Sequence, residues 1–452
     1  MRYFFIFLLF ISSIELISQE TDSLTLVDLV SRALEKDYEL SNRELKLEQQ
    51  QALRKQIRET FLPTLNVSSS YAYMTGNIVM DLPTFNTPIL DIPLFENKLT
   101  EAYNTNYFDA KAELQLVLFT GFKVRNLDLA VQKQIEANSF FLEQAKYDLM
   151  VEVVGYYDNL AILEQVKVLL DESEELLELE TEKAKKALEE DLITVYDYQK
   201  IEIASLKLEA KKVEYTGSKA LLYNKLKQLT GMTTSQIDSL KIELLVFDVN
   251  TENSNIENRP EMEALDLLEE ATNYKVRSLH SNYLPKIAAR GSLSYYNFFN
   301  GNLGDVNFNE FGLAPNAMVG VGLSWDLFDG MKTKREVQRA LIDQQMVINK
   351  KSEVQELLEL NLSNSLLSYN TNKIKLELKS KELSLNKKGL EIAKRQLEVE
   401  LIDLSQYLEA LNDYEKSILE YQEALKDERQ AALNYLKATG NMNMNYLKSN
   451  LN

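Results

Sequence analysis

The chain has 452 residues, of which 45% are apolar and 26% charged, with only 14 glycines and 7 prolines. This composition excludes a disordered or collagen-like chain, and the net charge of −19 argues against nucleic acid as a partner. There is no cysteine, and His280 is the single histidine, which excludes disulfides, thiolate-bound metals and multi-histidine metal sites. Because the sequence holds no paired acid–base or nucleophile constellation, we expect no metal, no cofactor and no enzymatic activity.

The first residues are typical of an export signal. Arg2 precedes an apolar run over residues 3–14, and Ser18 followed by Gln19 fits a cleavage site. We expect residues 1–18 to be removed as a signal peptide, with an uncleaved N-terminal anchor as the alternative. The mature chain would then function outside the cytoplasm.

The rest of the chain contains an internal duplication. The pattern L-x-x-x-L-F-x-G-x-K begins at Leu114 and again at Leu323, an offset of 209 residues. The same offset holds without a gap to the Thr-Gly pairs that end at Gly231 and Gly440. Upstream, the Leu-Pro pair at 62–63 matches the pair at 284–285 with an offset of 222. Two repeats of one structural unit are therefore predicted.

Each repeat is expected to have the same order of elements. The first repeat, 19–231, should contain a helix at 24–61, a strand at 63–75, an extracellular loop at 77–111, a strand at 112–120, a long helix at 122–189 and a helix at 193–231. An equatorial linker at 232–258 follows. The second repeat, 259–440, should contain a helix at 260–283, a strand at 285–297, a loop at 298–316, a strand at 317–328, a long helix at 330–398 and a helix at 401–440. Residues 441–452 form a C-terminal tail.

The four strands are predicted from apolar–polar alternation with a period of two, which gives one face suited to lipid or a core and one suited to water. The residues expected on the lipid-facing side are Leu65, Val67, Leu114, Leu116, Leu293 and Trp325. A soluble hairpin packed on helices would show the same alternation. Four strands cannot close a barrel, so membrane strands would have to be pooled by several chains; two copies would give eight strands, and three would give twelve, enough for a lumen.

The long helices carry apolar residues every seven positions. A helix over 122–189 would be about 100 Å long. One stripe lies on each of three helices: Leu149, Tyr156, Leu163, Leu170, Leu177 and Ala184; Leu362, Tyr369, Leu376, Leu383, Leu390 and Leu397; and Leu404, Leu411, Ile418, Leu425 and Ala432. Such stripes predict coiled-coil packing, with one face of an ordinary helical bundle as the alternative.

This ordered, duplicated set of motifs resembles the TolC family of outer-membrane efflux proteins. The resemblance covers residues 24–440 and includes Leu24-Thr-Leu-Val-Asp-Leu-Val with Ala33-Leu34 at the start. It implies a mainly α fold with a transmembrane β part: long antiparallel coiled-coil helices form a periplasmic α-barrel, and four strands per chain contribute to a twelve-stranded trimeric β-barrel. It also implies a homotrimer in the outer membrane of a Gram-negative-type bacterium. The expected partners are outer-membrane lipid, a periplasmic adaptor (membrane fusion protein) and an inner-membrane pump.

The resemblance also implies functional positions. The periplasmic tip that contacts the adaptor falls on the two turns between paired helices, at Asp191, Leu192, Ile193, Thr194, Glu400, Leu401, Ile402 and Asp403. The family usually has glycine where Asp191 and Glu400 stand. Acidic residues of the lumen and gate are implied at Asp197 and at Glu409, which keeps the second acid of a family D-x-x-D-A pattern while Gln406 replaces the first.

Two functions of different classes remain open at this point. One is a passive trimeric exit duct for small molecules, the outer-membrane channel component of a tripartite efflux or type I secretion system. The other is a structural coiled-coil envelope scaffold without transport activity. The four alternating strands favour the duct, because a scaffold has no use for them.

Overall fold

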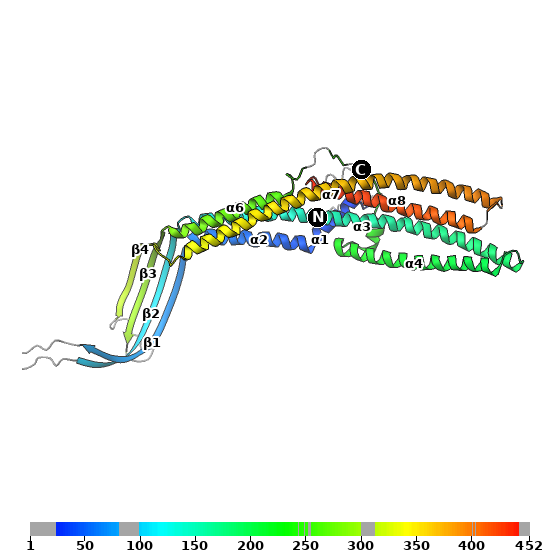
Figure 1. The fold of residues 1–452 in the computed structure, drawn as a ribbon. Coiled ribbons are helices and arrows are strands. Elements are labelled where there is room, and N and C mark those ends of the chain that lie inside the picture. Colours follow the sequence, from blue (N-terminus) through cyan, green and yellow to red (C-terminus); the bar gives the residue numbers. More distant parts are fainter. Residues whose placement is uncertain are drawn as a thin grey trace, which may run out of the picture. The chain divides into compact units, whose positions relative to one another are not determined.

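A computed structural model describes residues 24–80, 99–242, 244–247, 249–251, 255–299, 312–399, 401–402 and 404–442 (Figure 1). The expected signal peptide and residues 443–452 of the expected tail lie outside this part of the chain, as do Glu400 and Asp403. Within the described residues, the helices that are long enough to cross a bilayer are all too polar to do so.

The helices are α1 (Leu26–Lys36), α2 (Tyr38–Arg58), α3 (Lys123–Glu189), α4 (Val195–Thr230), α5 (Thr234–Asp238), α6 (Pro260–His280), α7 (Lys332–Glu398) and α8 (Leu404–Ala438). Short 3₁₀ turns, η1 (Glu59–Phe61) and η2 (Ser281–Tyr283), follow α2 and α6. The strands are β1 (Thr64–Met80), β2 (Leu99–Phe119), β3 (Lys286–Phe299) and β4 (Gly312–Ser324).

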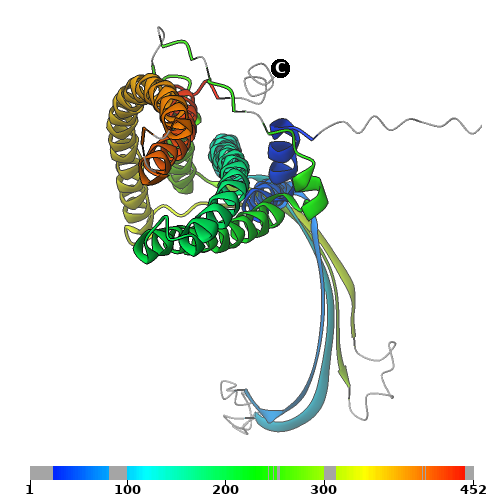
Figure 2. The ribbon, with the colours of Figure 1, turned by 90° about the vertical axis from the view of Figure 1, so that its right-hand side faces the viewer.

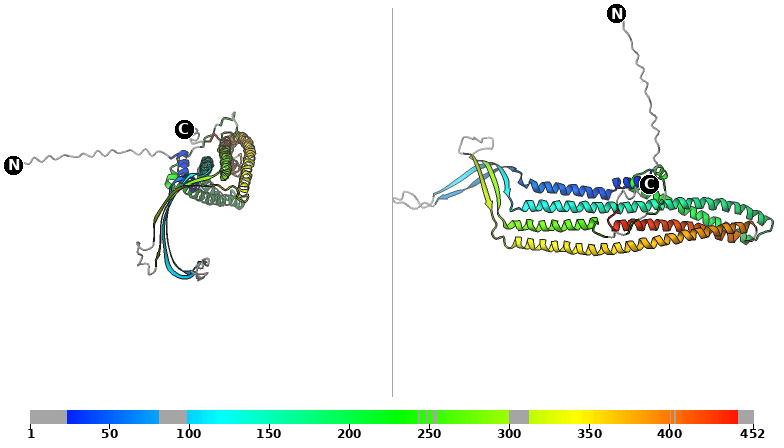
Figure 3. Two further views of the ribbon diagram at one scale, coloured as in Figure 1. Left: turned by 90° about the vertical axis from the view of Figure 1, so that its left-hand side faces the viewer. Right: turned by 90° about the horizontal axis from the view of Figure 1, so that it is seen from above.

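The chain forms two compact units. One comprises the described residues of Met1–Leu45, Phe140–Glu263 and Glu353–Asn452, and the other comprises those of Lys46–Ser139 and Ala264–Ser352. The units do not coincide with the sequence repeats, because each contains the corresponding part of both. In the second unit, α2, α6 and the first parts of α3 and α7 run alongside one another and lead into the four strands (Figure 3).

The duplication is visible in the backbone. Both α3 and α7 have 67 residues, and their ends are offset by 209; α2 and α6 both have 21 residues. Left-handed φ angles recur at Gly121 (64°) and Gly330 (67°) before the long helices, and at Gly231 (72°) and Gly440 (70°) after the second helices. Glycine is suited to these positions because it has no Cβ to clash in this conformation.

In the first unit, α3 pairs with α4 and α7 pairs with α8, as seen along the helices in Figure 2. The described members of the three sevenfold stripes are all buried or half-buried. Tyr369 of α7 and Tyr435 of α8 stack with their ring centroids 6.2 Å apart. The apolar repeats therefore form the seams between helices, as expected for coiled-coil packing.

The expected helix at 24–61 is wrong as a single element. It breaks at Asp37, which has an extended backbone and whose carboxylate accepts a hydrogen bond from the Leu40 amide at 2.8 Å. Asp37 therefore caps the start of α2, a role for which a short acidic side chain is preferred. Upstream, α1 begins with a capping box between Thr25 and Asp28 and buries its apolar face.

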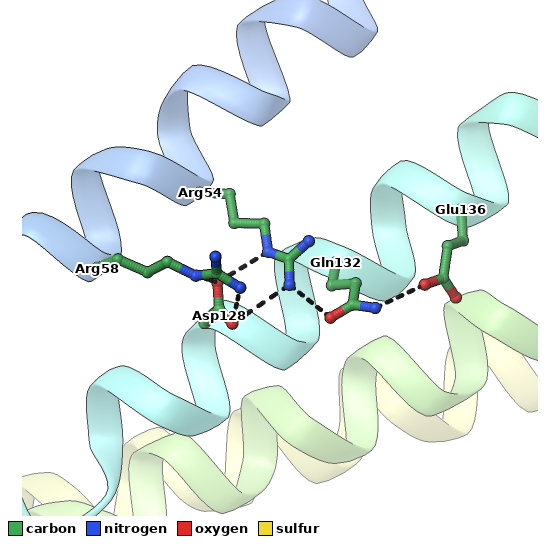
Figure 4. A network of polar contacts seen from close by, with 5 residues as sticks. All are labelled: Arg54, Arg58, Asp128, Gln132 and Glu136. Carbon is green, nitrogen blue, oxygen red and sulfur yellow. Dashed lines mark hydrogen bonds and ion pairs between the residues drawn. The ribbon is translucent and has the colours of Figure 1, made fainter.

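A charged network joins α2 to α3 beside the sheet (Figure 4). Nε of Arg54 and Nε of Arg58 donate to the Asp128 carboxylate at 2.8 and 2.7 Å, and Arg54 also donates to Gln132, which in turn donates to Glu136. Burial by itself would raise the pKa of Asp128, but the hydrogen bonds and charges of the two arginines outweigh burial and lower this pKa.

The strands form one antiparallel sheet in the order β1-β2-β3-β4. They are longer than expected, and the expected loop at 77–111 is wrong over much of its length, since β1 and β2 pair continuously from Thr64↔Gln115 to Met80↔Leu99. The expected loop at 298–316 and strand at 317–328 are also displaced, because β4 begins at Gly312 and ends at Ser324. Pro315 lies in β4 where the register with β3 shifts, and an edge strand tolerates proline at such an irregularity.

The linker between the repeats is anchored in the first unit. It contains α5, which has its own capping box at Thr233. The Tyr157 hydroxyl donates to the Lys241 carbonyl at 2.9 Å. Arg429 of α8 and Asp158 of α3 form a fully buried ion pair at 3.0 Å, and the guanidinium also stacks 4.2 Å from the Phe247 ring centre. Burial raises the pKa of Asp158, and the nearby charge of Arg429 offsets this only in part.

Candidate functional site

The sheet has two faces of opposite chemistry. Residues directly paired across antiparallel strands lie on the same face. The pairs Leu65↔Leu114, Ala112↔Leu293 and Ala289↔Val321 belong to one face, which we call the apolar face. It includes Leu65, Val67, Phe108, Ala110, Ala112, Leu114, Leu116, Ala289, Leu293, Val319, Val321 and Leu323, together with the polar Ser69.

The opposite face, which we call the polar face, carries the charges of the strands. Its polar and charged members are Asn66, Ser68, Ser70, Asp109, Lys111, Glu113, Gln115, Arg290, Ser292 and Ser294. Lys111 and Glu113 form an ion pair on it, and the Ser70 hydroxyl donates to the Asp109 carboxylate. The sheet therefore has a hydrophobic face on one side and a hydrophilic face on the other.

Five of the six residues expected to face lipid share the apolar face, while contact of this face with lipid stays a prediction. Leu65, Val67, Leu114, Leu116 and Leu293 all lie on the apolar face. Trp325 follows the end of β4 and lies outside the strands, at the sheet's helix end, where its indole Nε1 donates to the Tyr283 carbonyl at 2.9 Å. Trp325 therefore marks the junction between strands and helices.

The sheet has two open edges. Within the described residues, β1 and β4 are the outer strands of the order β1-β2-β3-β4, and neither has a partner on its outer side. An unpaired strand edge exposes a row of backbone donors and acceptors that another strand can satisfy.

The turn between α3 and α4 has a specific backbone geometry. Asp191 is left-handed, with a φ of 58°, and the Leu192 amide donates to the Ala187 carbonyl at 2.8 Å. The Asp191 amide donates to the Leu188 carbonyl, which completes a Schellman ending of the helix. This explains why glycine suits the position and why aspartate, which tolerates a left-handed φ better than most residues, can replace it.

The turn between α7 and α8 shares one of these hydrogen bonds. The Leu401 amide donates to the Gln396 carbonyl at 2.8 Å, the bond equivalent to the one at Leu192. Leu192 and Leu401 are 71% and 72% exposed, which leaves an apolar side chain in solvent at each tip. Thr194 is also exposed, and Ile193 and Ile402 are half-exposed.

The two acidic positions expected at the lumen lie on the second helix of each hairpin. Glu409 is exposed on α8. Asp197 lies in α4, and its side chain is outside the described part of the structure. Glu409 is therefore accessible to solvent.

Sequence reasoning missed a group of aromatic residues on the polar face. Tyr107, Tyr296 and Phe298 lie together there, beside Asp109. Tyr107 and Phe298 lie in stretches expected to be loops, 77–111 and 298–316, and Tyr296 lies near the end of the expected strand at 285–297. Alternation of Phe108 and Ala110 with Asp109 and Lys111 would have lengthened the strand as far as residue 108, but the sequence before it does not alternate and gives no signal for Tyr107.

The sequence pattern described as "Outer membrane efflux protein" matches residues 29–232 and 253–441. The chain belongs to the outer membrane efflux protein family. This membership confirms the resemblance noted from the sequence and assigns the chain to outer-membrane efflux channels rather than to an enzyme family. Among curated proteins, no significant sequence match is found.

Solved structures of other outer-membrane channels have the same fold as this family member. The Campylobacter jejuni CmeC outer membrane channel is 16% identical, with a TM-score of 0.72 over 94% of this chain and 88% of that one. The Vibrio cholerae outer membrane protein VceC is 14% identical, with a TM-score of 0.71 over 92% of this chain and 96% of that one. The Neisseria gonorrhoeae MtrE outer membrane channel is 15% identical, with a TM-score of 0.69 over 92% and 88%. The expected fold class is therefore confirmed.

Proposed function

We propose that three copies of this efflux protein pool their strands into a twelve-stranded barrel that serves as a passive exit duct for small molecules. The apolar face meets lipid and the polar face lines the lumen. The strand register supports this proposal most directly. It places hydrophobic side chains on one face of the sheet and charged side chains on the opposite face, and both outer strands have an unpaired edge. A barrel closed by β1 of one copy against β4 of the next removes every edge, as lipid requires.

The helices support assembly from several copies. On α7, Leu360, Leu367 and Ile374 are seven residues apart and each is more than half exposed. On α4, Leu206, Val213 and Ala220 are also seven apart and exposed. Two unpartnered apolar stripes with heptad spacing are suited to pack against each other between copies.

The repeat symmetry gives the register of this contact. Asp158 on α3 meets Arg429 on α8 inside one chain. Applying the offset of 209 converts these positions to Leu367 on α7 and Ala220 on α4, both of which are exposed. Leu367 of one copy should therefore lie beside Ala220 of its neighbour.

We assign adaptor contact to the two tips, at Asp191, Leu192, Ile193, Thr194, Glu400, Leu401, Ile402 and Asp403. The exposed leucines at the tips are suited to an apolar partner surface. In this proposal the adaptor connects the duct to an inner-membrane pump, and cargo moves through the lumen without chemical change.

We assign Glu409 and Asp197 to the lumen of the helical barrel. Threefold repetition of Glu409 would place three carboxylates around one bore and attract cations. Replacing Glu409 with glutamine should weaken both cation preference and block by multivalent cations in a planar bilayer. Unchanged preference and block would contradict this assignment.

Cross-linking tests the assembly. The chain has no cysteine, so Leu367→Cys with Ala220→Cys introduces one reactive pair between neighbours. A short bis-maleimide applied to outer membranes should produce covalent dimers and trimers. As a control, Leu367→Cys with Ile203→Cys shifts the second thiol about 25 Å along α4 and should give far less product.

Conductance tests the pore. The detergent-extracted trimer should form water-filled channels in a planar bilayer, and the protein should be recovered with the outer membrane. Recovery in the soluble periplasm without cross-linked trimers would contradict the duct and favour the envelope scaffold.

A further inference from the structure

The polar face changes character along β2 and β3. Near the helices it carries Glu113 and Lys111, which form an ion pair. Toward the far end of the strands, the same face carries Tyr107, which pairs across the sheet with Phe298, while Asp109 pairs with Tyr296. An aromatic patch therefore follows a charged one on the surface that we assign to the lumen.

The rings of this patch form a continuous surface. The centroid of Tyr107 lies 5.1 Å from that of Phe298 and 6.4 Å from that of Tyr296, the latter pair nearly parallel at 20°. Phe298 is 44% exposed and both tyrosines are half-exposed, so their ring faces remain accessible to a small molecule. Apolar area left in water lacks the stabilisation that burial would give. A duct that carried only water and ions would have no need of this surface.

A carboxylate lies within the patch. Asp109 is directly opposite Tyr296 and two residues from Tyr107, on the same face. The Ser70 hydroxyl donates to this carboxylate. Lys111 lies near enough to interact electrostatically with Asp109 but makes its ion pair with Glu113, so among the described residues no cation is in direct contact with the Asp109 carboxylate.

We propose that Tyr107, Asp109, Tyr296 and Phe298 form a binding subsite for organic cations that carry an aromatic or apolar group. The ring faces attract a cation through their quadrupoles, and the carboxylate neutralises it. The proposal rests on the proposed function, because it needs the polar face to line the lumen. Threefold repetition would place three such subsites around the channel, where departing cargo could pause between the aqueous lumen and the outside.

The chemistry distinguishes this ligand class from others. An organic anion would face both the Asp109 charge and the negative faces of the rings. Ca²⁺ and Mg²⁺ require six or more oxygen ligands or waters, whereas the patch offers one carboxylate among aromatic carbons. A cation with an apolar portion uses both components of the site.

Single-channel current in planar bilayers tests the proposal with the full-length trimer. The probes are benzyltrimethylammonium, which has a ring and a positive charge, benzenesulfonate, which has a ring and a negative charge, and tetramethylammonium, which has no ring. We expect benzyltrimethylammonium to reduce the current at the lowest concentration. Tyr107→Leu and Asp109→Asn should each raise its half-blocking concentration about fivefold or more.

Phe108→Leu is the matched control. Phe108 is the next residue in β2 but lies on the apolar face, where its ring centroid is 6.5 Å from that of Tyr295. This change should leave the block unaltered. Equal block by benzenesulfonate, or an equal loss of block in Phe108→Leu and Tyr107→Leu, would overturn the subsite. Asp109→Asn retains the size of the side chain and keeps the test available if Tyr107→Leu fails to assemble.

The two proposals fail in different ways. A wild-type trimer that conducts normally but shows no preference for the aromatic cation would overturn the subsite alone. A wild-type protein that forms no conducting channel would overturn the proposed function together with the subsite.

Discussion

The two repeats have nearly the same backbone but hold their helices together with different chemistry. In the first repeat, α2 and α3 are joined by Arg54 and Asp128 in a charged network. The equivalent positions of the second repeat are Val276 on α6 and Val337 on α7, both buried. The duplicated fold therefore requires helices of a given length and register, while the seam can be ionic or apolar.

The repeats also differ in which positions they bury. Asp158 and Arg429 are fully buried, whereas their equivalents, Leu367 and Ala220, are exposed. Within one chain α3 therefore packs against α8, whereas the equivalent surfaces of α7 and α4 remain exposed. The difference identifies an apolar surface that a second copy is suited to cover.

The largest effect should come from breaking the buried ion pair. Arg429→Met leaves Asp158 buried without its partner and should lower the free energy of unfolding by about 3–5 kcal/mol. Adding Asp158→Leu should recover most of that loss, since an apolar pair needs no solvation. Thermal and urea unfolding of the detergent-solubilised protein measure both. Lys416→Met, at an exposed position of α8, is the control, and a double variant no more stable than Arg429→Met would contradict the explanation.

The next largest effect is expected from alanine substitutions at two equivalent glycines, which should destabilise the two repeats to different extents. Gly121 and Gly330 have the same left-handed φ, but a Cβ at Gly121 would lie 2.7 Å from the Ser281 carbonyl oxygen, whereas none of the described atoms of this chain lies within 4 Å of one at Gly330. Gly330→Ala should cost about 1 kcal/mol from backbone strain, and Gly121→Ala should cost about 2–3 kcal/mol. Equal losses in unfolding experiments would show that crowding does not distinguish the repeats.

A smaller effect compares the ionic contact between α2 and α3 with the equivalent apolar contact between α6 and α7. Asp128→Asn removes the charge that two arginines share and should lower the free energy of unfolding by about 1–2 kcal/mol. Arg54→Val with Asp128→Val introduces the side chains of the second repeat and should be less destabilising than Asp128→Asn alone. If the double valine variant is the less stable of the two, the seams are not interchangeable.

The pH dependence of this seam follows from the lowered pKa of Asp128. Because the folded protein binds the proton less readily than the unfolded chain, the carboxylate stabilises the fold above the ordinary aspartate pKa of about 3.9. This contribution is lost as the pH falls through the lowered value. Asp128→Asn should therefore lose less stability on acidification than the wild type, as measured by thermal unfolding at neutral and acidic pH. Parallel curves would contradict this assignment.

The smallest expected effect is a gain at the tip. Asp191 adopts a left-handed φ, which glycine reaches with less strain. Asp191→Gly should raise the free energy of unfolding by about 0.5–1 kcal/mol, with no effect on conductance. Leu192→Ala, at the next exposed residue, should leave stability unchanged and weaken adaptor binding instead. A loss of stability in Asp191→Gly would show that the carboxylate has a structural contact of its own.

Much of the fold could be predicted from local sequence. Proline-free tracts, sevenfold apolar stripes and the offset of 209 residues located the long helices to within a few residues, because helix periodicity and breakers act locally. Alternation assigned five of six residues to the apolar face. The break at Asp37 was missed because a short capping residue inside a helical pattern is a weak signal.

Tertiary structure decided what local patterns could not. The length of β1 and β2 depends on cross-strand pairing over residues that alone resemble a loop. The burial of Asp158 and Arg429, far apart in sequence, depends on which helices become neighbours. The sequence by itself determined the elements, their duplication and the polarity of each strand, since these arise from neighbouring residues. Only the packed chain decided which faces are covered and which charged groups pair with one another, because those depend on contacts between distant segments.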